Sequence, residues 1–140
     1  MAAFFMSRFE EITLAILRVM AGLMLMQHGV QKILGLLGGE VVPVLSRNWF
    51  AGWLELVLGA LVVVGLCTRV AAFVLSGEMA FAYFLVHAPR GFWPVMNRGE
   101  LAALYCFVFL YLSSRGGGRY SLDALLARRR GLPPERRATG

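Results

Sequence analysis

The chain has 140 residues, of which 59% are hydrophobic and 16% are charged, against about 25% charged in an ordinary soluble domain. This excludes a disordered chain, which needs low hydrophobicity and high charge, and it argues against a water-soluble domain, because so short a chain cannot hide that much apolar surface. The net charge is +6. Seven arginines follow the last apolar segment, where they indicate membrane topology and anionic lipid rather than nucleic acid: Arg115, Arg119, Arg128, Arg129, Arg130, Arg136 and Arg137.

Four apolar stretches predict four membrane-spanning helices, at about residues 12–37, 49–66, 69–88 and 99–114. The first three have the roughly 18–25 residues that a helix needs to cross a bilayer, and the fourth is short. Turn signals such as Gly38-Gly39 and Pro89 separate the stretches. The expected fold class is therefore all-α, an integral membrane bundle of four transmembrane helices. It forms one domain over residues 1–123, followed by a basic cytoplasmic tail over residues 124–140.

The first stretch is predicted to be a retained helix, because Arg18 interrupts it and no small-residue cleavage site of a signal peptide follows. Four spans place both termini on one side of the membrane, together with Arg8, Arg69 and the seven arginines named above. The opposite side carries Lys32, Arg47, Arg90 and Arg98. Because positive residues accumulate on the cytoplasmic side, we expect an N-in, C-in orientation.

Ionisable residues inside a span are costly in lipid and mark functional sites by default. His28 and Lys32 are four residues apart and share one helical face in the outer half of the first span. Glu55 lies about 9 Å below the outer end of the second span. We predict a polar ligand-binding pocket in the outer half of the bilayer, formed by His28, Gln31, Lys32, Glu55, His87, Asn97 and Glu100. Two simpler alternatives stay open, namely that Lys32 extends to the headgroups and that Glu100 only favours its helix dipole.

Two further charges lie deeper in the predicted spans. Arg18 is about 9 Å and Glu78 about 13 Å from the inner ends of their helices. We predict a structural ion pair between them, since an unpaired charge at that depth would cost several kcal/mol. Cys67 and Cys106 stand alone, so no zinc or iron–sulfur spacing exists, and neither a haem, a flavin nor a nucleotide motif is present.

The last predicted element is a short amphipathic helix over residues 121–130, with Ser121 as its cap and three arginines at its end. We expect it to lie on the inner membrane surface.

Together these residues resemble the DoxX family of small four-helix bacterial membrane proteins. The resemblance extends from Leu17 to Asp123. It rests on Arg18, on the segment His28-Gly-Val-Gln-Lys32, and on Glu55-Leu-Val-Leu-Gly59 with Gly65-Leu-Cys-Thr-Arg69. It also includes Asn97-Arg-Gly-Glu100 and the final Gly116-Gly-Gly-Arg-Tyr-Ser-Leu-Asp123. Glu78 and the arginines after Asp123 depart from the family pattern.

The resemblance implies a multi-pass protein of the bacterial inner membrane, similar to the small subunit of a thiosulfate:quinone oxidoreductase or to proteins linked with oxidative-stress protection. A quinone is then the candidate ligand, and a soluble redox partner or a homo-oligomer is the candidate assembly. The chain would be at most the membrane subunit of an oxidoreductase and not a complete enzyme. Two alternatives remain, a small proton-coupled transporter with Glu78 as its carboxylate and a structural membrane anchor for a soluble partner.

Overall fold

The structure is a computed structural model that describes residues 2–131, and within this range it contains helices and no strand. The all-α expectation is therefore confirmed. Four long helices coincide with the four apolar stretches: α1 (Ala2–Leu34), α2 (Arg47–Val64), α3 (Thr68–Ala82) and α5 (Glu100–Arg115). Between α3 and α5 the chain forms a π-helix, η1 (Tyr83–His87), a 3-10 turn, η2 (Ala88–Arg90), and the short α4 (Pro94–Asn97).

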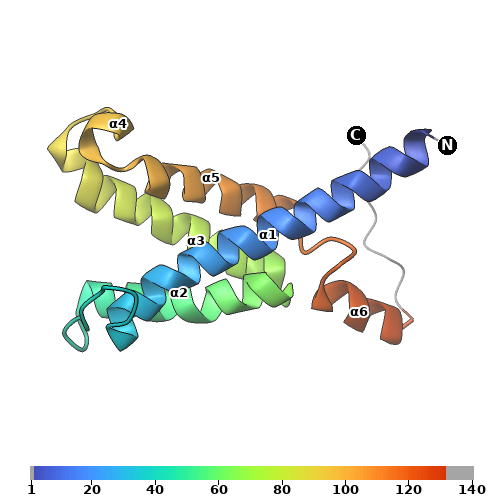
Figure 1. The fold of residues 1–140 in the computed structure, drawn as a ribbon, viewed down its shortest axis with the longest axis horizontal. Helices are drawn as coiled ribbons and strands as arrows, with labels where there is room; N and C mark the ends of the chain where they lie inside the picture. The colour runs from blue at the N-terminus through green and yellow to red at the C-terminus, as the bar shows by residue number, and fades with distance from the viewer. Residues whose placement is uncertain (1, 132–140) are drawn as a thin grey trace.

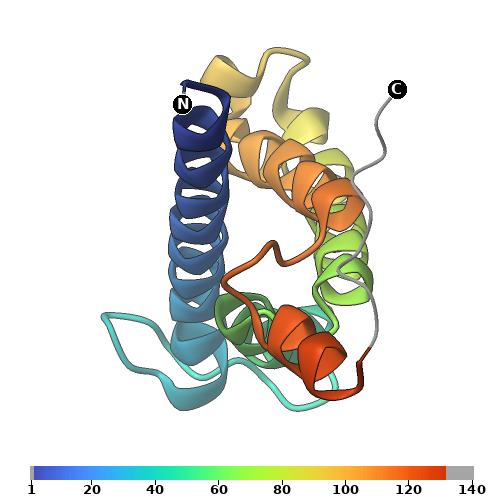
Figure 2. The same ribbon diagram turned by 90° about the vertical axis from the view of Figure 1, so that its right-hand side faces the viewer.

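The helices pack as two pairs, α1 against α2 and α3 against α5, with α2 and α3 joining the pairs. Figure 1 shows the beginning of α1 and the helix α6 (Leu122–Arg129) at one end of the molecule and α4 at the other. We call these the α6 end and the α4 end. Seen from the α6 end, α1 stands on one side and α3 with α5 on the other (Figure 2). Leu25, Leu75, Phe109 and Leu112 are buried in the apolar core between the pairs.

The α1–α2 pair depends on two glycines that allow the helix backbones to approach closely. A Cβ atom at Gly29 would lie 2.7 Å from the Gly52 carbonyl oxygen, and one at Gly52 would lie 2.9 Å from Cβ of Lys32. Since real Cβ atoms do not come this close to a backbone atom, a larger residue at Gly29 would force the helices apart. The crossing point therefore also sets the distance between Lys32 and the side chains of α2.

The turn between α2 and α3 is held by charged side chains from distant parts of the chain. Gly65, with φ of 75°, ends α2 in a left-handed cap, and the Arg18 guanidinium donates to the carbonyls of Val62 and Val63 just before it. At the start of α3 the Asp123 carboxylate accepts from the backbone N–H groups of Cys67 and Thr68 and from the Thr68 hydroxyl.

Both contacts match the helix dipole, a cation at a C-terminus and an anion at an N-terminus. Arg18 also donates to the carbonyl of Tyr120 at 2.8 Å, which ties the glycine-rich segment to the same turn. We call this group of residues the clasp: Arg18, Gly65, Thr68, Tyr120 and Asp123.

The predicted C-terminal helix is confirmed, because α6 begins directly after Ser121, whose hydroxyl accepts from the N–H of Ala124 at 3.2 Å. Its apolar residues Leu122, Leu125 and Leu126 are exposed. The rest of the predicted basic tail, from residue 132 with Arg136 and Arg137, lies outside the described residues.

The outer faces of the long helices are apolar. Two segments among the described residues, Arg47–Val64 and Thr68–Arg90, are long and apolar enough to cross a membrane. The first long helix adds a row of exposed side chains that includes Ile12, Ile16, Met20 and Leu23. Exposed apolar surface of this extent is typical of contact with lipid.

Candidate functional site

The best-defined polar contact inside the molecule is an ion pair between α1 and α2. Nζ of Lys32 lies 2.6 Å from Oε1 of Glu55. The Glu55 side chain is 4% exposed and that of Lys32 is 28% exposed, so the carboxylate is interior while the lysine approaches it from the edge. His28, one turn earlier on α1, is half-buried and interacts electrostatically with Glu55.

Two residues from the other helix pair contribute to the electrostatics around this ion pair. Glu78 of α3 interacts electrostatically with both Glu55 and Lys32, and Tyr105 of α5 interacts with Glu55. The two helices are held in antiparallel register close by, since the Ser76 hydroxyl donates to the Cys106 carbonyl at 2.8 Å. We call Lys32, Glu55, Glu78 and Tyr105 the acid cluster. One member comes from each of the four long helices.

The acid cluster contains buried polar atoms without a hydrogen-bond partner in the described part of the chain. They are Oε2 of Glu55, both carboxylate oxygens of Glu78 and the hydroxyl of Tyr105. A buried polar group left unpaired costs about 1–3 kcal/mol, and more if it is charged. Such groups are rare in proteins unless an ion, a ligand or a proton satisfies them.

The charges of the acid cluster are unbalanced as well. It holds two carboxyl groups and one ammonium group, and burial disfavours the surplus negative charge. The cluster is therefore best suited to a state in which one carboxyl group is protonated or in which a hydrogen-bond donor is bound.

The other residues of the predicted pocket take different places. Nε2 of Gln31 donates to the Leu37 carbonyl at 3.0 Å, at the end of α1. Nδ1 of His87 lies 3.1 Å from the carbonyl oxygen of Asn97, in the connection between α3 and α5. Asn97 is itself 1% exposed and bonds to Gly91 and Gly99. Glu100 is exposed in the first turn of α5.

The seven residues of the predicted pocket thus form separate groups. His28, Lys32 and Glu55 lie together, and His87 pairs with Asn97. Gln31, His87 and Asn97 make local contacts that hold loops and helix ends. That His28, Lys32 and Glu55 bind a ligand stays a prediction.

The predicted ion pair of Arg18 with Glu78 is wrong. Arg18 is 2% exposed, but its guanidinium lies in the clasp, on carbonyls of Val62, Val63 and Tyr120. A long side chain on a helix points back toward the helix N-terminus, which directs Arg18 toward the α6 end and away from Glu78. The prediction compared only the depths of Arg18 and Glu78 in the membrane and did not consider the direction of the Arg18 side chain.

Sequence reasoning missed Tyr105 altogether. Tyr105 is 5% exposed and stacks on Phe109 at 5.8 Å between ring centroids, so it resembles an ordinary aromatic core residue. The signal available was its hydroxyl, which in an apolar helix interior needs a polar partner.

Comparisons with known proteins identify one family and several relatives. A family model described as DoxX matches residues 13–88. A protein of Haemophilus influenzae, named only as uncharacterized, is 40% identical over 84% of this chain and 93% of its own length. A protein of Mycobacterium tuberculosis named as an uncharacterized membrane protein is 34% identical over 81% of this chain and 80% of its own. No solved structure is significantly similar to the chain.

Proposed function

The chain belongs to the DoxX family of membrane proteins, and we propose that it is a quinone-binding membrane subunit that handles protons for a soluble redox partner. The observation that carries this proposal is the acid cluster, with four polar atoms that lack a hydrogen-bond partner within residues 2–131 and a surplus of one carboxyl group. In the proposal all four long helices cross the inner membrane of a bacterium, with the α6 end in the cytoplasm.

The orientation in this proposal is supported by charge, while one of the four helices is short for a span. Helix α5 has 16 residues, about 24 Å at the helical rise, which is slightly short for the hydrocarbon layer. The described arginines of the C-terminal segment, from Arg115 to Arg130, gather at the α6 end. Positive charge of this kind favours the cytoplasmic side.

In this proposal the polar atoms of the acid cluster bind the headgroup of a quinone. A quinone supplies two-electron chemistry, since it becomes a quinol by taking up two electrons and two protons. Glu55 and Glu78, when protonated, would hold those two protons at their carboxyl oxygens. Ionised carboxylates only accept hydrogen bonds, so the cluster would also hold the two hydroxyl donors of the reduced form.

The remaining residues have supporting roles in the proposal. Tyr105 would orient an oxygen of the headgroup through its hydroxyl, and Lys32 would stabilise negative charge that develops there. His28 is half-buried beside Glu55 and would return protons to it from the water-facing edge. The two electrons come from the soluble redox partner.

The test is the stabilisation of purified protein by short-chain quinol and quinone analogues, measured as a shift of the melting temperature. The proposal expects a quinol-dependent shift in the wild type that is lost in Glu78→Gln and in Glu55→Gln. The matched control is Glu40→Gln, which removes an exposed loop carboxylate and should keep the shift. Quinone absent from lipid extracts of the protein, with no shift by either analogue, would contradict the proposal.

A proton-coupled transporter is the second candidate function. The observation in its favour is that Arg18 lies in the clasp and so does not neutralise Glu78, whose carboxylate oxygens have no hydrogen-bond partner within residues 2–131. Substrate uptake by vesicles that depends on a proton gradient and is abolished by Glu78→Gln would support it. If His28→Ala and Glu55→Gln change neither assay, and growth under oxidative stress is unaffected, a structural anchor is the better description.

A further inference from the structure

A cleft opens between α1 and α5 at the α6 end, away from the acid cluster. It has a volume of about 520 Å³ and is lined by Glu10, Thr13, Leu14, Leu17, Tyr111 and Arg115. The cleft exists because α1 and α5 belong to different helix pairs and touch each other little. A space between two helices in a membrane does not remain empty, because unfilled space forfeits dispersion contacts.

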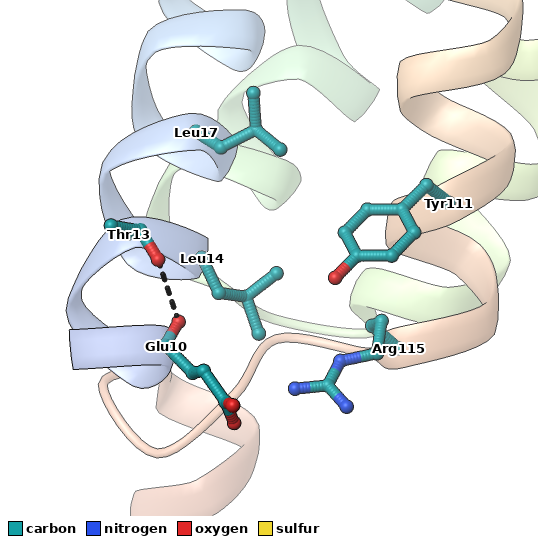
Figure 3. A pocket seen from close by; sticks show the side chains of 6 residues that line it. All are labelled: Glu10, Thr13, Leu14, Leu17, Tyr111 and Arg115. Atoms are coloured by element: carbon teal, nitrogen blue, oxygen red, sulfur yellow. Dashed lines mark hydrogen bonds between the residues drawn. The ribbon is translucent and has the colours of Figure 1, made fainter. Parts of the chain in front are cut away.

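The cleft is polar at one end and apolar at the other. Figure 3 shows the carboxylate of Glu10 and the guanidinium of Arg115 facing each other near its lower edge, with the Tyr111 hydroxyl directed into the cleft. Leu14 and Leu17 line its upper part. Glu10 and Leu17 are seven residues apart on one helix, about 10 Å at the helical rise. This gradient matches a molecule with a polar head and a hydrocarbon tail.

The charges at the polar end select the kind of head. Arg115 and the Tyr111 hydroxyl are donors suited to a phosphate. Glu10 is an acceptor suited to an ammonium group, and it repels a head that carries only negative charge. The Thr13 hydroxyl donates within its own helix, to the carbonyls of Phe9 and Glu10, so its proton is not available to a headgroup.

We propose that this cleft binds one phospholipid whose headgroup carries both a phosphate and a primary ammonium group, as phosphatidylethanolamine does. The phosphate lies on Arg115 and Tyr111, the ammonium on Glu10, and an acyl chain on Leu14 and Leu17. The site involves none of the residues of the acid cluster, so it stands whether or not a quinone binds there.

The test uses full-length protein in mild detergent with an equimolar mixture of phosphatidylethanolamine, phosphatidylcholine and phosphatidylglycerol, and counts retained lipid by native mass spectrometry. The wild type is expected to retain one phosphatidylethanolamine in preference to the other two. Glu10→Gln should reduce its preference over phosphatidylglycerol about fivefold, the effect of roughly 1 kcal/mol, and Arg115→Gln should weaken retention of both. Tyr111→Phe should have a smaller effect in the same direction.

Two control variants remove charges that lie outside the cleft, Glu40→Gln and Arg128→Gln, and both should bind lipid as the wild type does. Equal retention of the three lipids, or a preference unchanged by Glu10→Gln, overturns the proposal. A lipid-free protein whose oligomeric state changes in Arg115→Gln also overturns it, since a second copy of the chain is then the occupant.

Discussion

The clasp and the acid cluster each bury an ionisable side chain almost completely, yet they treat it in opposite ways. Arg18 is 2% exposed, and its two terminal nitrogens donate to three backbone carbonyls. Glu55 is 3% exposed, and one of its oxygens has no hydrogen-bond partner in the described part of the chain. Within residues 2–131 Arg18 lacks a hydrogen-bond partner at Nε alone. A buried cation that bonds to backbone through both terminal nitrogens stabilises a fold, whereas a buried carboxylate with missing partners indicates where protons or ligands act.

The sharpest test of this comparison is Arg18→Leu, because it removes the donors to the carbonyls of Val62, Val63 and Tyr120. We expect a loss of about 4 kcal/mol in the free energy of unfolding, seen as a low yield of folded protein. Arg128→Leu on α6 is the control and should fold normally. Adding Glu78→Gln to Arg18→Leu should not restore the yield of folded protein. A restored yield would mean that Arg18 and Glu78 do form an ion pair.

Asp123→Asn tests the other half of the clasp. The neutral amide retains one acceptor oxygen in place of a carboxylate that receives three hydrogen bonds. We expect a loss of about 2–3 kcal/mol, measured as a lower melting temperature. Thr68→Val removes only one of these bonds and should cost about 1 kcal/mol. Equal melting temperatures for Asp123→Asn and the wild type would exclude a role of Asp123 in holding α3.

Lys32→Met tests the acid cluster, the other side of the comparison, by removing its cation. It leaves two buried carboxyl groups without their cation, and we expect a loss of about 2 kcal/mol at neutral pH. Because Glu78 then has no favourable partner, Glu78→Gln in the same chain should recover part of that loss. A double variant that is as unstable as Lys32→Met alone would show that Glu78 and Lys32 do not interact.

Glu78→Gln by itself should have a small effect on stability. Both of its carboxylate oxygens lack partners within residues 2–131, so a neutral amide should change the free energy of unfolding by less than about 1 kcal/mol. The quinol-dependent shift in melting temperature should disappear at the same time. A large destabilisation would place Glu78 with Arg18 among the structural charges.

The smallest effect is expected for Glu100→Gln, since this carboxylate is exposed at the first turn of α5. Its melting temperature should match that of the wild type within the range of ordinary surface changes, about 0.5 kcal/mol. A larger shift, or loss of quinol stabilisation, would return Glu100 to the functional site.

Periodicity and composition were enough to predict the helices. Each long helix has an apolar outer face, and Ser121 with Asp123 marks the start of α6, so these elements follow from local sequence. The proximity of Lys32 and Glu55 could also be predicted from the sequence. Both residues lie in the outer halves of consecutive helices, and antiparallel packing brings these halves together. The glycines at the α1–α2 crossing make that approach close.

The partners of Arg18, Glu78 and Asp123 could not be predicted in the same way. Each depends on a contact between segments far apart in sequence, and a single chain gives depth along a helix but not the direction in which its faces are turned. The π-helix at Tyr83–His87 is a similar case, because it shifts the end of α3 relative to its earlier turns. Neither feature leaves a periodic signal.

The contact of Asp123 with the start of α3 has a consequence for the order of assembly during synthesis. Thr68 is made 55 residues before the carboxylate that binds it, so α2 and α3 are complete while the turn between them still lacks its anion. The turn becomes fixed only when the glycine-rich segment emerges and closes over it. A nascent chain that stops before residue 123 therefore contains the four long helices but lacks the carboxylate that binds the turn between α2 and α3.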